Sequence, residues 1–294
     1  MKAETTRAVK QKEGKEFFMK VLITGASSGI GKDMAKILNQ KGYNLVLVAR
    51  DIEKLEQTKK DLEKSVQNEQ TIENNKIEKA YKNSKKVTNK IEIIQMDLSE
   101  EQNCIELANK VKDVDILINN AGFGDCGKFS ETDLNKDISM IKTNVIAYHI
   151  LTKLYLKEMK KKNSGKILNV ASIAGFMPGP LMATYYATKN YIVRLSEAIR
   201  EELKKEKSKV QISILCPGPV ETNFNKVANV KFNLREANSM QVAKYAIKKL
   251  EKGKFYIVPR IDVKLARFGA KIAPSNFVAK ITYKVQKRKI QGSA

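Results

Sequence analysis

The 294-residue sequence contains one histidine and three cysteines, and no apolar run approaches the roughly 18 residues that a membrane-spanning helix needs. Cys104, Cys126 and Cys216 are widely separated and form no C-x-x-C pair, so we expect buried apolar side chains and no metal or dithiol site. Residues 1–18 lack the apolar centre of a signal peptide. These absences favour a cytoplasmic location for a chain with 42% hydrophobic residues.

Basic charge is the most unusual bulk property, because 55 lysine and arginine residues against 32 acidic residues give a formal net charge of +23. Such a charge often indicates a nucleic-acid or anionic membrane partner. Only eight of the basic residues are arginine, whose planar guanidinium suits bidentate contacts to phosphate and guanine, and the lysines are spread along the chain. We therefore expect no nucleic-acid partner.

Short apolar segments alternate with segments of helical periodicity along most of the chain. The apolar segments are typical of strands buried on both faces, and they span residues 20–24, 45–49, 91–96, 115–119, 166–172, 210–216 and 255–259. Helical patterns between them include residues 33–40, 137–160, 185–205 and 240–250. This alternation predicts one α/β domain with a doubly wound parallel sheet of about seven strands, covered by helices on both faces.

Three segments depart from this alternation. Residues 65–90 are rich in Asn, Lys and Glu, which predicts an inserted, mobile surface excursion after the second strand. Residues 1–18 are expected to be a flexible extension, so the domain spans residues 19–260. Residues 261–294 form a basic amphipathic segment. We expect no chemistry from the extension or the insertion.

The stretch "VLITGASSGIGK" places Gly25 directly after the first strand, and Gly29 and Gly31 where a helix begins. Glycines at such a junction let the backbone turn tightly and approach a pyrophosphate, whose charge is met by unpaired N–H groups and the helix dipole. The same letters also satisfy G-x-S-x-G with Ser27 as a nucleophile, which would indicate a hydrolase. That alternative requires a histidine base, and His149 is the sole candidate.

Several motifs together resemble the short-chain dehydrogenase/reductase family. They are "TGASSGIG" (24–31), "MDLS" (96–99), "NNAG" (119–122), Asn144, Ser172, "YYATK" (185–189) and "PGPVET" (217–222). The resemblance covers the chain from Lys20 to about Pro259 and implies a single-domain Rossmann-type fold with an NAD(P)-dependent oxidoreductase activity. It also implies a homodimer or homotetramer.

Tyr185 and Lys189 lie four residues apart on a predicted helix, so the ammonium can lie near the phenol and favour its ionised form. Ser172 ends a predicted strand and can hydrogen-bond a carbonyl oxygen of the substrate. The resemblance implies Tyr185 as proton donor, Ser172 as orienting group, Lys189 as a further contact to the nicotinamide ribose, and Asn144 as the holder of a water. Tyr186 is a competing donor, although the Y-x-x-x-K spacing selects Tyr185.

Cofactor choice depends on the end of the second strand, where Ala49 stands in place of the acidic residue that would bind the ribose of NAD. Arg50 can pair with the 2′-phosphate of NADP, and Asp51 is expected to begin the next helix. We therefore expect NADP(H), with NAD(H) as the alternative. By resemblance, the remaining cofactor contacts are Gly25, Ser27, Ser28, Gly29, Ile30, Gly31, Asp97, Leu98, Asn119, Ala121, Gly122, Tyr185, Lys189, Pro217, Gly218, Val220 and Thr222.

The loops at residues 173–184 and 223–238 are apolar, which favours a hydrophobic small-molecule carbonyl as substrate, although the same residues could simply pack together. The predicted function is an NADPH-dependent carbonyl reductase that is reversible as an alcohol dehydrogenase. Alternatives are a 3-oxoacyl thioester reductase, a hydroxysteroid dehydrogenase, or a non-catalytic NADP(H)-binding sensor.

After Pro259, apolar residues recur at helical spacing on either side of Pro274. Two short amphipathic helices there could cover the substrate pocket, pack on another subunit, or lie on an anionic membrane. We favour packing on protein over peripheral membrane contact, because neither apolar stripe is long. The apolar positions are Ile261, Leu265, Phe268, Ile272, Phe277, Ile281 and Val285.

Overall fold

The computed structural model describes residues 9–12, 15–77, 89–222, 224, 228 and 236–291. Its centre is a seven-stranded sheet of order β5-β4-β3-β6-β7-β8-β9, in which every neighbouring pair is parallel. The prediction of a doubly wound parallel sheet of about seven strands is confirmed. The strands are β3 (Lys20–Thr24), β4 (Asn44–Ala49), β5 (Ile91–Gln95), β6 (Ile116–Asn119), β7 (Lys166–Val170), β8 (Gln211–Leu215) and β9 (Tyr256–Ile257).

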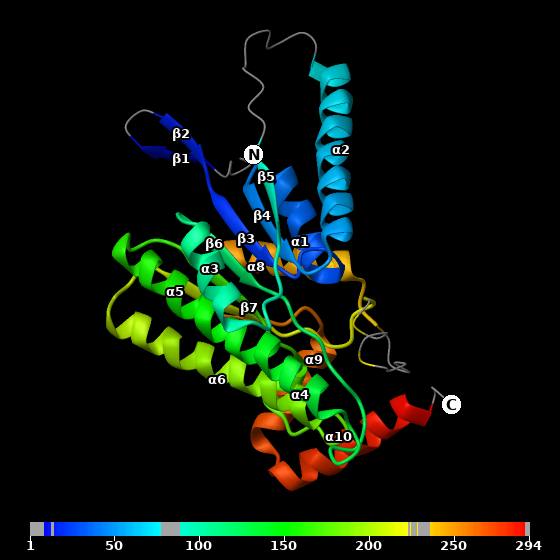
Figure 1. Cartoon of the computed structure of the whole chain (residues 1–294). Coiled ribbons are helices and arrows are strands. Elements are labelled where there is room, and N and C mark those ends of the chain that lie inside the picture. Colours follow the sequence, from blue (N-terminus) through cyan, green and yellow to red (C-terminus); the bar gives the residue numbers. More distant parts are fainter. Residues whose placement is uncertain are drawn as a thin grey trace.

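Helices cover both faces of the sheet (Figure 1). On one face lie α1 (Gly29–Gln40), α2 (Ile52–Ile77) and α8 (Ser239–Glu251), and on the other lie α3 (Glu101–Lys110), α5 (Ala147–Lys161) and α6 (Ala183–Lys205). Side chains of a strand alternate between faces, so Val21 and Ile23 pack with the first set while Leu22 packs with the second. This double burial explains why the strands read as continuous apolar runs.

The direction of winding reverses between β3 and β6. From β3 the chain proceeds outward to β4 and β5, and it then returns to place β6 on the other side of β3. Leu22 of β3 accordingly pairs with Val46 on one side and with Leu117 on the other. Ligands of such sheets bind at the carboxyl ends of the strands where this reversal opens a crevice. The glycine-rich loop follows β3, and the "NNAG" segment follows β6.

The helix expected over residues 137–160 is interrupted. The structure has α4 (Leu134–Ile141), a π-helical turn η1 (Lys142–Ile146) and then α5. Hydrophobic periodicity does not reveal such a turn, because buried residues occur on both sides of it, Met140 in α4 and Tyr148 in α5. Asn144, one of the predicted catalytic residues, lies in this turn.

The N-terminal extension and the 65–90 insertion both contain regular structure. The extension holds an antiparallel hairpin, β1 (Val9–Lys12) and β2 (Lys15–Phe18). Helix α2 continues to Ile77, so the first half of the expected 65–90 excursion is helical, while residues 78–88 lie outside the described residues. Glu, Gln and Lys have high helix propensity, so a segment rich in them can be helical even without an apolar face. Composition alone did not reveal this helix.

The C-terminal segment forms two helices on either side of Pro274, as the pattern predicts. They are α9 (Ile261–Ile272) and α10 (Ser275–Gln291). They lie at one end of the molecule, opposite the projecting end of α2 (Figure 1). Of the helices in the described part of the chain, none is both long enough and apolar enough to span a bilayer. A short 3-10 helix, η2 (Ile173–Phe176), lies between β7 and α6.

Candidate active site

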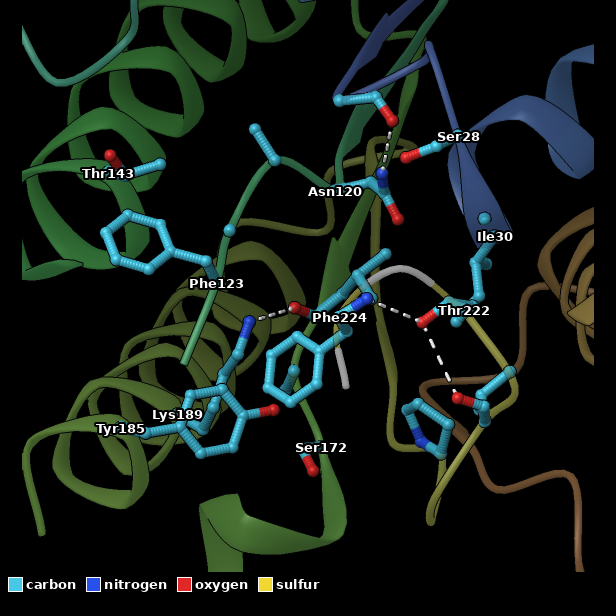
Figure 2. A pocket seen from close by; sticks show the side chains of 18 of the residues that line it. Ser28, Ile30, Asn120, Phe123, Thr143, Ser172, Tyr185, Lys189, Thr222 and Phe224 are labelled. Atoms are coloured by element: carbon cyan, nitrogen blue, oxygen red, sulfur yellow. Dashed lines mark hydrogen bonds between the residues drawn. The ribbon is translucent and has the colours of Figure 1, made fainter. Parts of the chain in front are cut away.

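The crevice at the carboxyl ends of the central strands is a cavity of about 480 Å³. The predicted catalytic residues Ser172, Tyr185 and Lys189 line one side of it (Figure 2). Most of the predicted cofactor residues line the rest, namely Gly25, Ser27, Ser28, Gly29, Ile30, Arg50, Asp97, Leu98, Ala121, Gly122, Pro217, Gly218, Val220 and Thr222. Segments that are far apart in the sequence therefore meet at one site.

The glycine-rich loop is shaped for a close approach of backbone to a ligand. Gly25 has a φ of +63°, and a Cβ atom added there would lie 2.8 Å from the Cα atom of Ala121. Ser28 caps α1 in an extended conformation without a side-chain hydrogen bond to the helix, and the first turn of α1 contains no acidic residue. The helix thus presents N–H groups and the positive end of its dipole to the cavity, which suits a pyrophosphate.

Gly31 and Asn119 are not on the cavity wall. A Cβ atom on Gly31 would lie 2.3 Å from the backbone oxygen of Gly25, so Gly31 allows the helix to pack on the loop. The Asn119 side chain is fully buried and donates to Thr152 and Asn169, both at 3.0 Å. The neighbouring Asn120 lines the cavity instead. It donates to the carbonyl oxygen of Gly25 at 3.0 Å, which fixes the turn.

The Asn144 side chain is likewise buried outside the cavity. Its Oδ1 atom accepts from the backbone N–H of Phe123 at 3.1 Å, and its Nδ2 atom donates to the Phe123 carbonyl oxygen at 2.8 Å. A further bond runs to the hydroxyl of Thr188 at 3.2 Å. The amide thus ties the loop after β6 to the π-helical turn and to α6. These bonds use both N–H groups of the amide, so the side chain has no further proton to donate to the expected water.

The Lys189 ammonium group lies between α6 and the end of β7. Its Nζ atom donates to the carbonyl oxygen of Val170 at 3.0 Å and lies 5.8 Å from the centre of the Tyr185 ring. Figure 2 shows Tyr185 and Lys189 directed into the cavity beside Ser172. The Ser172 hydroxyl accepts from the backbone N–H of Ala174 at 3.2 Å, which holds its oxygen at the end of the strand.

Burial controls the ionisation of this group. It raises the pKa of Tyr185 to about 12, against a smaller opposite effect of the hydrogen bond with Ser172. Burial also lowers the pKa of Lys189 to about 8, because the ammonium form loses hydration. The pKa of Tyr185 therefore lies above its ordinary value, and not below it as expected, because burial is the largest influence on the phenol. At neutral pH the phenol carries its proton and Lys189 is charged.

Tyr186, the competing proton donor, has a different environment. Its hydroxyl accepts a hydrogen bond from the Nε2 atom of Gln286 on α10, and its ring packs edge-on against Tyr185. Tyr186 borders the cavity, but its hydroxyl is engaged by another helix. The geometry thus distinguishes the two adjacent tyrosines, in favour of Tyr185.

The end of β4 supplies positive charge to the other end of the cavity. Ala49, Arg50, Asp51 and Lys54 all line it. The Asp51 carboxylate accepts from the backbone N–H of Lys54 at 3.0 Å and pairs with its ammonium group at 2.5 Å. The Lys54 bond holds the pKa of Asp51 below its ordinary value. Asp51 therefore caps the start of α2, as expected, and its charge is matched by a neighbouring cation.

The loop after β8 closes the cavity against the glycine-rich loop. A Cβ atom on Gly29 would lie 3.0 Å from the Cγ2 atom of Thr222. The Thr222 hydroxyl accepts from the backbone N–H of Phe224 at 3.3 Å, and the Phe224 ring lies 5.2 Å from the Tyr185 ring. This loop thus contacts both the predicted phosphate side and the predicted substrate side.

Some lining residues were not identified from the sequence. They include Met96, Asn120, Phe123 and Thr143. Asn120 and Met96 lie inside two of the family motifs. The motifs therefore identified these segments as part of the site, but not which side chains of each segment line the cavity. Phe123 and Thr143 carry no chemical signature, and only the fold brings them to the cavity.

The hydrolase alternative is not supported by the site. His149 is not among the residues that line the cavity with Ser27. His149 is half-buried on α5, and its Nδ1 atom lies 2.7 Å from the hydroxyl of Tyr191. A serine nucleophile would need the imidazole within hydrogen-bond reach.

A family model described as short chain dehydrogenase matches residues 19–73 and 69–231. The chain belongs to the short-chain dehydrogenase family. The family model is named for dehydrogenases, so the match supports the expected class of NAD(P)-dependent oxidoreductase. The NADP-dependent 3-hydroxy acid dehydrogenase of Schizosaccharomyces pombe is 35% identical over 211 residues, which cover 70% of this chain and 73% of the relative.

Two other members of the short-chain dehydrogenase family illustrate the range of the similarity. Human dehydrogenase/reductase SDR family member 7 is 31% identical over 70% of this chain and 56% of its own length. This chain spans only 52% to 59% of the length of several such animal and fungal relatives. A short-chain dehydrogenase from Sphingobium yanoikuyae, solved in complex with NADPH, superposes with a TM-score of 0.73 at 25% identity, covering 86% of this chain and 92% of that one.

Proposed function

We propose that this protein is an NADP(H)-dependent reductase of a hydrophobic carbonyl compound, reversible as an alcohol dehydrogenase. The observation that carries this proposal is the convergence of Ser172, Tyr185 and Lys189 on the cavity that the glycine-rich loop also lines. A nicotinamide cofactor fits the residues present, because the start of α1 offers N–H groups to a pyrophosphate. Added Cβ atoms on Gly25 and Gly29 would also crowd Ala121 and Thr222 on the cavity wall. When bound, the cofactor supplies or accepts the hydride.

The three polar residues have separate roles in this proposal. Ser172 hydrogen-bonds the carbonyl oxygen of the substrate and holds it beside the phenol of Tyr185. Tyr185 delivers its proton to that oxygen as negative charge develops, and burial keeps the phenol protonated until then. The Lys189 ammonium stabilises the phenolate that this step leaves. Asn144 acts indirectly, by fixing the loop after β6 and the π-helical turn.

A preference for NADP(H) over NAD(H) rests on charge at the end of β4. Arg50 and Lys54 line the cavity, and Ala49 occupies the position where an acidic residue would repel a 2′-phosphate. Asp51 is paired with Lys54, so its carboxylate opposes a phosphate less strongly. The S. pombe relative is named as NADP-dependent, and the Sphingobium enzyme was solved with NADPH.

The hydrophobic character of the substrate rests on the wall around Tyr185. Phe123, Met182, Tyr186 and Phe224 line this side of the cavity. Among the described lining residues, the cations other than Lys189 are Arg50 and Lys54 at the other end. That distribution favours a ketone or a 3-oxoacyl thioester over a short free acid, although one relative is a 3-hydroxy acid dehydrogenase. A very-long-chain 3-oxoacyl-CoA reductase is 34% identical over 65% of this chain, which supports the thioester alternative.

The sensor alternative predicts loss of the reactive pair, whereas Tyr185 and Lys189 are both present and both line the cavity. A cytoplasmic location and a homodimer or homotetramer stay predictions.

The deciding experiment follows NADPH and NADH oxidation by the purified chain with 3-oxoacyl thioesters, keto-steroids, simple hydrophobic ketones and short 3-oxo acids. The proposal expects turnover with NADPH and at least one hydrophobic carbonyl. Saturable NADPH binding without turnover on any compound would favour the sensor. Failure to bind either nucleotide would refute the assignment of the glycine-rich loop.

A further inference from the structure

The apolar stripe of α9 faces outward. Ile261, Leu265, Phe268 and Ile272 follow one another at intervals of three and four residues, so they share one face of the helix. Their side chains are 64% to 71% exposed. On α10, Phe277 and Ile281 continue the pattern at 58% and 48% exposure. We name these six residues the C-terminal apolar stripe. Single exposed apolar residues are common, whereas a periodic set of this kind indicates an interaction surface.

The two helices are attached to the domain through other residues. On α10, Val278, Thr282 and Gln286 are buried. The Thr282 hydroxyl donates to the carbonyl oxygen of Pro178 at 2.9 Å, and Gln286 donates to the hydroxyl of Tyr186.

On α9, Val263 is buried, and the Arg267 guanidinium lies 3.5 Å from the centre of the Tyr256 ring. Both helices are therefore held in place without the apolar stripe. The opposite face of α10 contacts Tyr186 at the cavity wall, so that face, and not the apolar stripe, covers the pocket.

The charge of this segment indicates what contacts the stripe. Residues 260–291 contain nine lysine or arginine residues and a single acidic residue, Asp262. The Asp262 carboxylate is already bound by Arg260 at 2.9 Å. Lys264 and Lys280 are exposed, and each directly precedes a residue of the stripe, Leu265 and Ile281. The apolar face is thus flanked by unneutralised positive charge.

Apolar side chains flanked by lysines match an anionic lipid surface, where the former enter the boundary of the acyl chains and the latter meet the headgroups. A second copy of this chain is a poorer match, because a symmetric contact would bring two strongly basic faces together. We propose that α9 and α10 dock the protein on the surface of an anionic membrane, lying along it without crossing it. The docking face lies on the same helix pair that contacts the wall of the cavity, so the substrate side of the cavity is held near the lipid.

The test is co-sedimentation of the full chain with vesicles, which needs no substrate and no turnover. Vesicles of phosphatidylcholine mixed with phosphatidylglycerol are compared with vesicles of phosphatidylcholine alone. We expect the protein to pellet with the anionic vesicles and to remain in solution with the neutral ones. The double variant Leu265→Gln, Phe268→Gln should bind at least about tenfold more weakly, because two exposed side chains no longer enter the apolar boundary. Both positions are exposed, so the fold should be unaffected.

Matched controls separate this surface from general hydrophobicity and charge. Ile105→Gln changes an exposed apolar residue on α3 and should bind like the unmodified protein. The double variant Lys264→Glu, Lys280→Glu should weaken vesicle binding by about tenfold or more. Its control is the double variant Lys36→Glu, Lys60→Glu on α1 and α2, which changes the net charge by the same amount. This control should have a much smaller effect on binding.

Three results would overturn the proposal. The first is an absence of pelleting with anionic vesicles, and the second is equal pelleting of the C-terminal variants and the controls. The third is that the unmodified protein does not bind vesicles while light scattering gives a different oligomeric mass for the double variant Leu265→Gln, Phe268→Gln than for the unmodified protein. That result would assign the stripe to a contact with a second copy of the chain.

Discussion

The Nζ atom of Lys189 donates to the carbonyl oxygen of Val170 at 3.0 Å, at the end of β7 and two residues before Ser172. This bond places a buried cation beside the strand that also positions the hydroxyl of Ser172. Because the ammonium group has little contact with water, its charge depends on pH in a range where lysine is ordinarily always charged.

The first prediction concerns the pH dependence of reduction. The pKa of Lys189 is lowered to about 8, so the ammonium form predominates below that pH and the neutral amine above it. The pKa of Tyr185 is about 12, so the proton donor keeps its proton throughout. With saturating NADPH and substrate, kcat for reduction should therefore fall as the pH rises through about 8.

Two variants identify the group responsible for this pH dependence. In Lys189→Arg, whose guanidinium stays charged, the decline near pH 8 should disappear from whatever activity remains. Tyr186→Phe should keep the decline, because Tyr186 is engaged by Gln286. A kcat that is flat to pH 10, or a decline that persists in Lys189→Arg, would exclude Lys189 as its source.

The second prediction distinguishes the adjacent tyrosines. Tyr185→Phe should lower kcat by about a hundredfold or more, because it removes the proposed proton donor. Tyr186→Phe should change kcat by less than about tenfold, since it removes a hydroxyl that bonds to α10. NADPH binding, followed by fluorescence, should survive in both variants. Equal loss of activity in both would refute the assignment of the donor.

Much of this architecture was predictable because both faces of the sheet are buried. Strands such as residues 20–24 read as unbroken apolar runs, and the glycines after the first strand mark the crevice. The motif letters then indicated which loops meet there, since parallel strands bring their carboxyl ends to one edge of the sheet.

The details that sequence reasoning missed depend on individual side-chain directions. Within "NNAG", Asn119 turns into the core while Asn120 turns to the cavity, and neighbouring letters do not encode that choice. The π-helical turn around Asn144 lies inside a segment of helical periodicity, so the sequence pattern does not reveal it. The stripe of α9 has the periodicity of a buried face, yet it is exposed, because periodicity shows only that residues share a face.

The third prediction concerns cofactor choice. Arg50→Ala should raise the KM for NADPH by about tenfold or more, because a charged hydrogen bond to the 2′-phosphate is lost. The KM for NADH should change little. Lys36→Ala, an exposed cation on α1 outside the cavity, serves as control and should leave both values unaltered. An equal rise in KM for both nucleotides would indicate that Arg50 supports the loop and does not read the phosphate.

The last prediction compares two helical glycines. In Gly31→Ala the new methyl group would lie 2.3 Å from the Gly25 oxygen and 2.5 Å from the Asn120 Nδ2 atom, so the glycine-rich loop must shift. We expect the free energy of unfolding to fall by about 1–3 kcal/mol, with weaker NADPH binding. Gly269→Ala on α9 has no atom within 4 Å of the new methyl group and should raise the free energy of unfolding by about 0.5–1 kcal/mol.

Urea unfolding of both variants measures the difference, and NADPH titration shows whether the loop keeps its shape. If Gly31→Ala were as stable as the unmodified protein and bound NADPH equally well, the contact between Gly31 and Gly25 would not constrain the loop. The close packing of α1 on the end of β3 would then be unnecessary for the site. Opposite signs for the two substitutions would instead show that steric contact, and not helix propensity, requires glycine at position 31.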